Sequence, residues 1–357
     1  LAMLSAMEKD WYNPSSLYTP GQQASGTLMD ARVRIAHCLG CLPKEIYFTS
    51  GGSEADNQAI LSAAAIGKRQ GKMHIISTAF EHHAVLHTLK KLEKEGFEIT
   101  LLDVGEKGIV SPVQVEKAIR PDTILVTVMY ANNEIGTIQP IREIGAICRK
   151  NGVLFHTDAV QAAGHLQINV EKDQIDMLSL SAHKFNGPKG IGVLYAKTGV
   201  FLTNLIEGGG QERGKRAGTE NLPAIVGMVA ALEEACSLQK ERSIYVTKLR
   251  DQLIDGLKKI PGALLNGDAT NRLPGNVNFC FPDTEAEGLL LLLDNKGICA
   301  SSGSACTSGF LDPSHVLLAI GRDPQTARGS LRLTLDYENT PEEVETIIEA
   351  VTDTVRI

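Results

Sequence analysis

The chain has 357 residues, of which 43% are hydrophobic and 22% are charged, and its formal net charge is -7. This length allows about two domains with substantial cores. The negative charge argues against direct binding to nucleic acid or to an anionic membrane surface. No apolar run approaches the roughly 18 residues of a membrane span, and residues 1–5 lack the basic flank and apolar core of a signal peptide. We therefore expect a cytoplasmic protein.

The seven cysteines are an odd number spread along the chain, which does not suit a disulfide framework. Cys38 and Cys41 have CxxC spacing, but no second cysteine pair or histidine pair completes a zinc set. We predict two packed thiols at a helix end and no metal site. The chain begins with Leu1 instead of methionine, so we expect further sequence before it.

The first two thirds of the chain alternate between strand-like and helix-like segments. Predicted strands cover residues 45–49, 74–77, 98–102, 123–129, 153–157 and 176–181, and predicted helices cover 28–39, 53–61, 83–94, 113–119 and 141–150. Such alternation predicts an α/β fold with a mostly parallel sheet and helices on both faces. We assign residues 12–234 to this large domain.

The pattern changes after Gly208-Gly209-Gly210. Long helical stretches are predicted over residues 221–259, followed by strands 276–281 and 330–335 and helices 285–294 and 342–354. We assign residues 235–357, together with 1–11, to a smaller α+β domain.

Lys184 lies between the strand-like segment 176–181 and the turn Gly187-Pro188-Lys189-Gly190. Open α/β sheets build their sites at the carboxyl ends of strands. A lysine amine that is partly desolvated there has a lowered pKa and can form a Schiff base. For a lysine in such a loop, a solvated side chain is commoner than a Schiff base. The choice between the two therefore depends on the other motifs.

Three further motifs are predicted at the same sheet edge. Gly51-Gly52-Ser53 follows a strand and opens a helix, which makes either an anion-binding cup or a simple capped helix. Asp158 follows strand 153–157, where it can hold a protonated ring nitrogen or cap a helix. His82 follows strand 74–77 and can stack on an aromatic ring, although a lone surface histidine is commoner.

Residues 300–311 are nearly all small and include Cys306. Such a run packs poorly, so we expect a mobile loop that carries an exposed thiol. A thiol that becomes a thiolate is a nucleophile and a sulfur carrier. The alternative is a Gly/Ser linker with an incidental cysteine.

Together these motifs resemble those of the cysteine desulfurases of the NifS/IscS-like kind, which are pyridoxal 5'-phosphate (PLP) enzymes of aminotransferase class V with fold type I. The resemblance runs from Tyr12 to the last predicted helix. It implies that Lys184 is the Schiff-base lysine and that Asp158 holds the ring nitrogen. Gln161 would contact the ring hydroxyl oxygen, and His82 would stack on the ring.

The resemblance also implies the other ligands. The phosphate would be held by Gly52, Ser53, Ser181, His183 and, from a second subunit, Thr219. Asn133 and Arg332 would bind the substrate carboxylate, and Cys306 would carry the persulfide.

The implied reaction converts L-cysteine to L-alanine in a homodimer and delivers sulfur to an iron–sulfur scaffold, to tRNA thiolation or to another acceptor protein. A class V aminotransferase or a selenocysteine lyase is an alternative on the same scaffold, and a sulfur-relay protein without turnover is a third. An aminotransferase needs no thiol such as Cys306, and intact Lys184 and Asp158 argue against lost turnover. Family members usually open with an Asn-Ala-Thr-Thr-like segment, and this chain starts beyond it.

Overall fold

The computed structural model describes residues 1–303 and 313–355; residues 304–312 and 356–357 lie outside this description. The chain forms two compact units. Unit 1 contains Leu1–Leu102, Pro112–Tyr130 and Pro140–Gln239, and unit 2 contains Asp103–Ser111, Ala131–Gln139 and Lys240–Ile357.

This division differs from the domain bounds expected from the sequence in two ways. The first residues belong to unit 1, because Ala6 in the N-terminal helix is buried and Met3 packs against Gly227. Two short segments of the first half, Asp103–Ser111 and Ala131–Gln139, belong to unit 2. Neither segment forms a helix or a strand of the main sheet, so no periodicity marked them.

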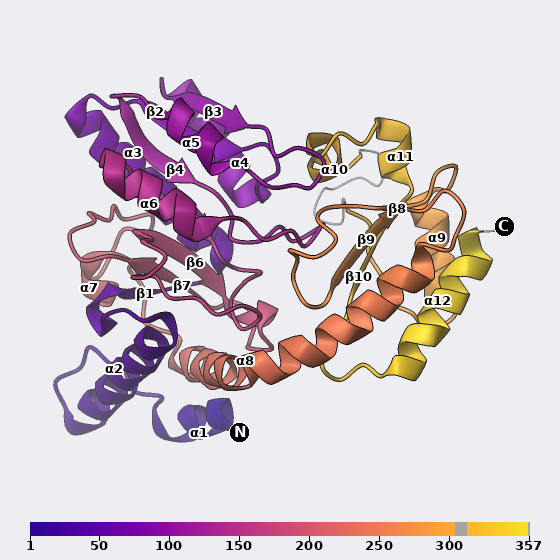
Figure 1. The fold of residues 1–357 in the computed structure, drawn as a ribbon. Coiled ribbons are helices and arrows are strands. Elements are labelled where there is room, and N and C mark those ends of the chain that lie inside the picture. Colours follow the sequence, from indigo (N-terminus) through magenta and orange to yellow (C-terminus); the bar gives the residue numbers. More distant parts are fainter. Residues whose placement is uncertain (304–312, 356–357) are drawn as a thin grey trace. The chain divides into compact units, whose positions relative to one another are not determined.

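Unit 1 is built on a seven-stranded sheet (Figure 1). Its strands are β1 (Ile46–Thr49), β2 (His74–Thr78), β3 (Glu98–Leu102), β4 (Thr123–Thr127), β5 (Leu154–Asp158), β6 (Met177–Ser181) and β7 (Gly192–Ala196). Its helical segments are α1 (Ala2–Lys9), α2 (Thr19–Leu39), η1 (Pro43–Glu45), α3 (Gly52–Gln70), α4 (His83–Lys94), α5 (Pro112–Ala118), α6 (Ile141–Asn151), η2 (Ala182–Lys184), α7 (Gln211–Gly214) and the first part of α8 (Leu222–Leu257).

The strand order in this sheet is β1-β7-β6-β5-β4-β2-β3. Strand β7 is antiparallel to β1 and β6, and the other neighbouring pairs are parallel. Every residue of β2, β4 and β6 is buried, as expected for parallel strands covered on both faces. The predicted α/β fold with a mostly parallel sheet is confirmed, whereas β7 was not predicted.

Unit 2 has a three-stranded antiparallel sheet in the order β10-β9-β8. Its elements are β8 (Leu264–Leu265), β9 (Asn276–Cys280), β10 (Ser330–Thr334), α9 (Ala286–Asp294), α10 (His315–Ala319), α11 (Pro324–Arg328) and α12 (Pro341–Val355). Its core joins the second half of α8 to α9, α12 and the sheet through a continuous set of buried aliphatic and aromatic side chains. Burial of this apolar surface stabilises the unit.

Helix α8 is the one helix in the described part of the chain whose length and composition would allow it to cross a membrane, with a mean hydropathy of 1.3 over 18 residues. A core helix of a soluble protein has the same composition. Ile225 and Met228 are buried in unit 1, and Leu249 and Leu253 belong to the core of unit 2. These apolar residues of α8 therefore lie in the cores of the two units.

A buried ion pair ties α2 to the sheet of unit 1. The Arg32 guanidinium donates to both carboxylate oxygens of Glu212, at 2.8 and 2.5 Å, and to the carbonyl of Ile46 at 2.8 Å. Glu212 also accepts from the backbone N–H of Phe48 at 2.9 Å. Arg32 and Glu212 are only 4% and 3% exposed, so removal of either partner leaves a buried charge without its counterion.

We expect Arg32→Ala to lower the free energy of unfolding of unit 1 by about 3 kcal/mol, because Glu212 stays buried without a cation. Arg34→Ala is the matched control, since Arg34 lies on the same helix and pairs with Glu233 on the surface. Arg34→Ala should lower the free energy of unfolding by less than about 1 kcal/mol, because its ion pair is exposed to solvent. Calorimetric unfolding of both variants checks this, and equal losses would contradict the role given to burial.

Candidate active site

The sheet topology brings the predicted cofactor residues of unit 1 to one edge. Strands β2, β4, β5 and β6 run in the same direction, so their carboxyl ends share an edge. Asp158 ends β5 and pairs in register with Ser179, two residues before Ser181 at the end of β6. Ser181 and Thr49 both pair with Gly192 of β7. The turn that begins α3 therefore lies beside Ser181.

The Asp158 carboxyl is buried, with 6% of the residue exposed, and its Oδ1 accepts from the backbone N–H of Val160 at 2.9 Å. Burial raises the pKa of Asp158, while this hydrogen bond and the charges of His82 and Lys184 act in the opposite direction. A buried carboxyl of this kind ionises readily only when a cation comes close. A protonated ring nitrogen is such a cation.

Two more buried acids surround this carboxyl, and sequence reasoning missed both. Burial and the neighbouring charge of Asp158 raise the pKa of Asp56, in α3, well above its usual range. Burial raises the pKa of Glu81 to about 8, even though Glu81 accepts from Thr78 Oγ1 at 2.6 Å and from the N–H of Met129 at 3.0 Å. Three neighbouring carboxyls in the interior cannot all carry a charge.

His156 lies among these acids on β5. Its Nδ1 is 2.8 Å from Thr127 Oγ1 and its Nε2 is 3.0 Å from Ser179 Oγ. The same Nε2 is 3.6 Å from Oδ1 of Asp56. Burial lowers the pKa of His156 to about 3, so the ring is neutral and supplies no balancing charge. The only sequence signal for this network was polar residues within apolar strands.

The glycine turn lies beside Ser181 of β6, which in turn contacts His183 of η2. A β-carbon added at Gly51 would lie 3.7 Å from Ser181 Oγ, and one added at Gly52 would lie 3.6 Å from Ser181 Cβ and 2.6 Å from Val160. Ser181 Oγ is itself 2.9 Å from Nδ1 of His183. These groups surround the N-terminus of the 19-residue helix α3, whose free N–H groups attract anions.

Thr219 lines a pocket of about 180 Å³ together with Thr49, Ser50, Gly190 and Arg216. Arg216 donates to Glu54 at 2.9 Å, which fixes this loop against the first turn of α3. Thr219 therefore shares this pocket with Thr49, the last residue of β1.

Lys184 is the last residue of η2, and its side chain is exposed. Its carbonyl accepts from Nε2 of His165 at 3.1 Å, and its charge lowers the pKa of Asp158. The chain turns directly afterwards through Asn186, at φ 63°, and Gly187, where an added β-carbon would lie 2.9 Å from Ala182. The predicted strand end and turn are therefore confirmed.

His82 precedes α4 and accepts the N–H of Ala84 on its Nδ1 at 3.1 Å. This bond assigns the proton of the neutral ring to Nε2. His82 lies close enough to Asp158 that a positive charge on its ring would act to lower the pKa of that carboxyl. Gln161 lies in the turn after β5 and is half-buried.

Unit 2 brings together the two predicted ligands of the substrate carboxylate. Arg332, in β10, donates to the carbonyl of Asn133 at 3.1 Å and to Ser301 Oγ at 3.3 Å. Both residues are half-buried. A planar guanidinium beside an amide suits bidentate binding of a carboxylate. Cys306 falls within residues 304–312, outside the described residues.

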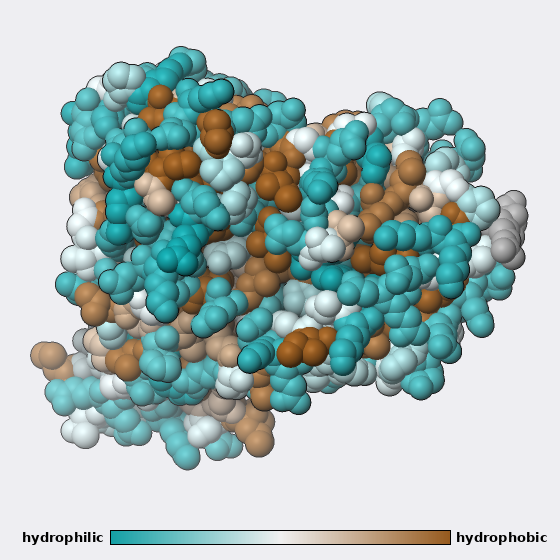
Figure 2. Space-filling model, viewed as in Figure 1, coloured by the Kyte–Doolittle hydropathy of each residue, from teal (hydrophilic) through white to brown (hydrophobic). Residues whose placement is uncertain are grey.

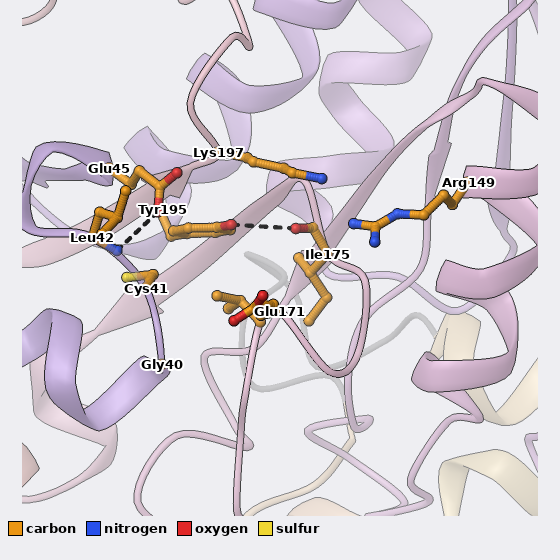
Figure 3. Close-up of a pocket in the computed structure, with 10 residues that line it drawn as sticks. Gly40, Cys41, Leu42, Glu45, Arg149, Glu171, Ile175, Tyr195 and Lys197 are labelled. Carbon is orange, nitrogen blue, oxygen red and sulfur yellow. Dashed lines mark hydrogen bonds between the residues drawn. The ribbon is translucent and has the colours of Figure 1, made fainter.

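A larger pocket, of about 380 Å³, lies at the opposite edge of the sheet (Figure 3). Tyr195 and Lys197 line it near the end of β7, which pairs there with the beginning of β6. Tyr195 donates to the carbonyl of Ile175 at 3.4 Å. None of the predicted site residues lines this pocket. Its charged lining residues are Glu45, Glu171, Arg149 and Lys197.

Cys38 and Cys41, predicted to be two packed thiols at a helix end, lie in different surroundings. Gly40, at φ 70°, ends α2 and turns the chain so that Cys41 lines the larger pocket. Cys38 instead has a hydrogen bond with Cys236 of α8, and this bond together with burial raises the pKa of Cys38. No group of three metal-binding side chains occurs among the residues described.

Comparison with known proteins agrees with this arrangement. The profile of the family Aminotransferase class-V matches residues 2–347. Cysteine desulfurase IscS of Methanosarcina thermophila is 53% identical over 355 residues, which cover 99% of this chain and 88% of that protein.

Solved structures extend the similarity to the fold. A NifS-like protein matches with a TM-score of 0.93 and 37% identity, covering 99% of this chain and 94% of its own. A structure described as SspA in complex with cysteine matches with a TM-score of 0.82 and 37% identity, covering 95% of each chain. The chain therefore belongs to the class V aminotransferase family and, within it, to the NifS/IscS-like cysteine desulfurases.

Proposed function

We propose that this protein is a PLP-dependent cysteine desulfurase that converts L-cysteine to L-alanine and leaves the sulfur on Cys306 as a persulfide. The observation that carries the proposal is the meeting of Asp158, Lys184 and the glycine turn at one sheet edge. The families of the matching proteins supply the substrate class, because SspA was solved with cysteine bound and IscS is named for this activity.

The residues at this edge fit PLP. Asp158 would face the ring nitrogen, because burial raises the pKa of its carboxyl and a cation beside it favours the ionised form. Gly52, Ser53, Ser181 and His183 would hold the phosphate, since their groups surround the N-terminus of α3. When bound, PLP supplies a ring that accepts electrons from the substrate carbon.

Other side chains complete the cofactor site in this proposal. His82 would stack on the ring, and Gln161 would contact the ring hydroxyl. Thr219 would reach the phosphate of a second subunit. Lys184 would bind the cofactor covalently through Nζ and, once displaced by substrate, move the proton of the substrate Cα.

Substrate binding and sulfur transfer use residues of unit 2. Arg332 and Asn133 would hold the carboxylate of L-cysteine. The thiolate of Cys306 attacks the substrate sulfur; the new S–S bond forms as the C–S bond breaks, and the electron pair remains with carbon. That carbon takes a proton, which gives alanine.

The proposal also includes a homodimer and an acceptor for the sulfur. Trp11, Leu17 and Met29 are 68%, 90% and 54% exposed, and hydrophobic residues are visible over α1 and α2 at the lower left of Figure 2. Exposed apolar groups of this kind fit a homodimer contact. The acceptor would be an iron–sulfur scaffold or a tRNA-thiolation protein in the cytoplasm.

Lys184→Ala should abolish the visible absorbance of protein loaded with PLP and lower alanine formation from L-cysteine by about 10³-fold or more, because the covalent attachment and the proton carrier are both lost. Lys172→Ala, which removes an exposed lysine of the same unit, is the matched control and should retain both. Absorbance spectra and an alanine assay decide the matter. A Lys184→Ala protein with normal spectrum and turnover would refute the assignment.

Cys306→Ser should keep the absorbance of bound PLP while losing sulfide release from L-cysteine in the presence of reductant, because serine cannot carry a persulfide. Cys299→Ser changes the neighbouring exposed thiol and should leave sulfide release unchanged. Mass spectrometry of the wild-type protein after one turnover should find 32 Da, about one sulfur atom, added to the peptide of Cys306. Unchanged sulfide release from Cys306→Ser would refute this role.

A further inference from the structure

The sheet of unit 2 has one apolar face and one polar face. Successive side chains of a strand point to opposite faces of a sheet. The alternate residues of β9 and β10 that belong to the apolar core are Val277, Phe279, Leu331 and Leu333. Asn276, Asn278 and Arg332 therefore lie on the opposite face.

Asn278 is the direct partner of Arg332 in the register of β9 and β10. Opposed residues of an antiparallel pair have their β-carbons about 4.5–5.5 Å apart on one face of the sheet. Asn278 is fully buried, whereas Arg332 is half-buried. The register thus places a buried amide next to the guanidinium that would bind the substrate carboxylate.

The side chain of Asn278 has a defined orientation. Its Oδ1 accepts from Nδ2 of Asn266 at 2.7 Å, and its Nδ2 donates to the carbonyl of Glu134 at 3.0 Å. The Asn266 amide is oriented in the same way, because its Oδ1 accepts from Nε of Arg322 at 2.7 Å. A guanidinium can only donate, so the oxygen and nitrogen of both amides are assigned by this chain of hydrogen bonds.

Asn133 is held by the backbone on both of its sides. The carbonyl of the next residue, Glu134, accepts from Asn278 and also from Nδ2 of Asn276 at 3.1 Å. Oδ1 of the preceding residue, Asn132, accepts the N–H of Glu134 at 2.8 Å. This bond closes a tight turn around Asn133, and the two amides of β9 fix that turn to the sheet.

The turn in turn orients the guanidinium of Arg332. Its Nη1 donates to the carbonyl of Asn133 at 3.1 Å, and its Nη2 donates to Oγ of Ser301 at 3.3 Å. Within the described residues these bonds use two of its five N–H donors. Bidentate binding of a carboxylate needs two parallel donors. A shift of Asn133 would rotate the guanidinium and misalign the donors that face the substrate.

We propose that Asn278 is a positioning residue for the substrate carboxylate, because it fixes the backbone at Glu134 and so sets the carbonyl of Asn133 against Arg332. This inference rests on the proposed roles of Arg332 and Asn133. Asn278 acts through the guanidinium alone. Its loss should therefore weaken only those ligands that carry a carboxylate.

The test measures binding to the PLP-loaded protein, without turnover. L-alanine is the probe that carries a carboxylate, and ethylamine is the matched probe that lacks one. Asn278→Ala removes the amide, and Asn278→Ser is the milder change because it keeps a polar side chain on the same face. Phe279→Leu is the matched control, since Phe279 is the next residue of β9 and is equally buried, but lies in the apolar core.

Both Asn278 variants should bind L-alanine about 10-fold or more weakly than wild type and bind ethylamine as wild type does. KM for L-cysteine should rise by the same factor while kcat stays close to that of wild type. Phe279→Leu should lower Tm and leave both dissociation constants unchanged. In an Arg332→Ala background, Asn278→Ala should weaken L-alanine binding by less than about 2-fold, because the effect acts through Arg332.

The proposal is overturned if either folded, PLP-loaded Asn278 variant binds L-alanine as tightly as wild type does. It is also overturned if ethylamine loses as much affinity as L-alanine, or if the full loss persists in the Arg332→Ala background, since either result would show a general effect on the fold. A failure of the proposed function gives a different result. Wild type would then form no alanine from L-cysteine, while the comparison of L-alanine with ethylamine binding would still decide the role of Asn278.

Discussion

Asp158 ends β5 with its carboxyl buried and with Asp56 and Glu81 close enough to disfavour further negative charge. The neighbouring His156 is held neutral by burial. The described interior of unit 1 therefore holds three neighbouring acids, and burial raises the pKa of each of them although His82 and Lys184 act to lower that of Asp158. A cationic ring nitrogen at Asp158 offsets this accumulation of acids, and the same accumulation favours the protonated ring that the chemistry needs. The buried neighbours thereby increase the affinity of one carboxylate for one cation.

The position of this carboxyl follows from the sheet. Because β1, β2, β4, β5 and β6 run in one direction, whatever follows each strand lies at the same edge. The glycine turn follows β1, Glu81 and His82 follow β2, and Lys184 follows β6. Residues more than 100 positions apart in the sequence are therefore brought to one edge by the backbone of the sheet. The antiparallel β7 closes this arrangement by pairing Gly192 with both Thr49 and Ser181.

The strands and helices of unit 1 were largely predictable, because apolar periodicity and glycine turns are local signals. The edge carrying Lys184 and Asp158 could be predicted for the same reason. The buried acids could not be, since Asp56 lies within a helix whose pattern gives no sign that its carboxyl faces a strand residue. The partner of Cys38 was likewise hidden, because Cys236 is nearly 200 residues away and no local pattern reports such a contact. Cys41, with its suggestive spacing, lies in a different environment.

The segment Ala131–Gln139 connects the proposed cofactor site of unit 1 with the proposed substrate-binding residues of unit 2 along the chain. Tyr130, the residue before it, donates its N–H to the carbonyl of Asp158 at 2.8 Å. Within the segment, Asn133 and Glu134 belong to unit 2, where they contact Arg332 and Ser314. A single stretch of backbone thus leaves the strand edge that would hold the cofactor and supplies Asn133, the proposed partner of Arg332 in binding the substrate carboxylate. Because Asn276, Asn278 and Arg272 all hold this backbone through side-chain hydrogen bonds, its conformation depends on polar contacts with defined directions. A purely apolar contact would leave the register of these residues undefined, and with it the position of Asn133 beside Arg332.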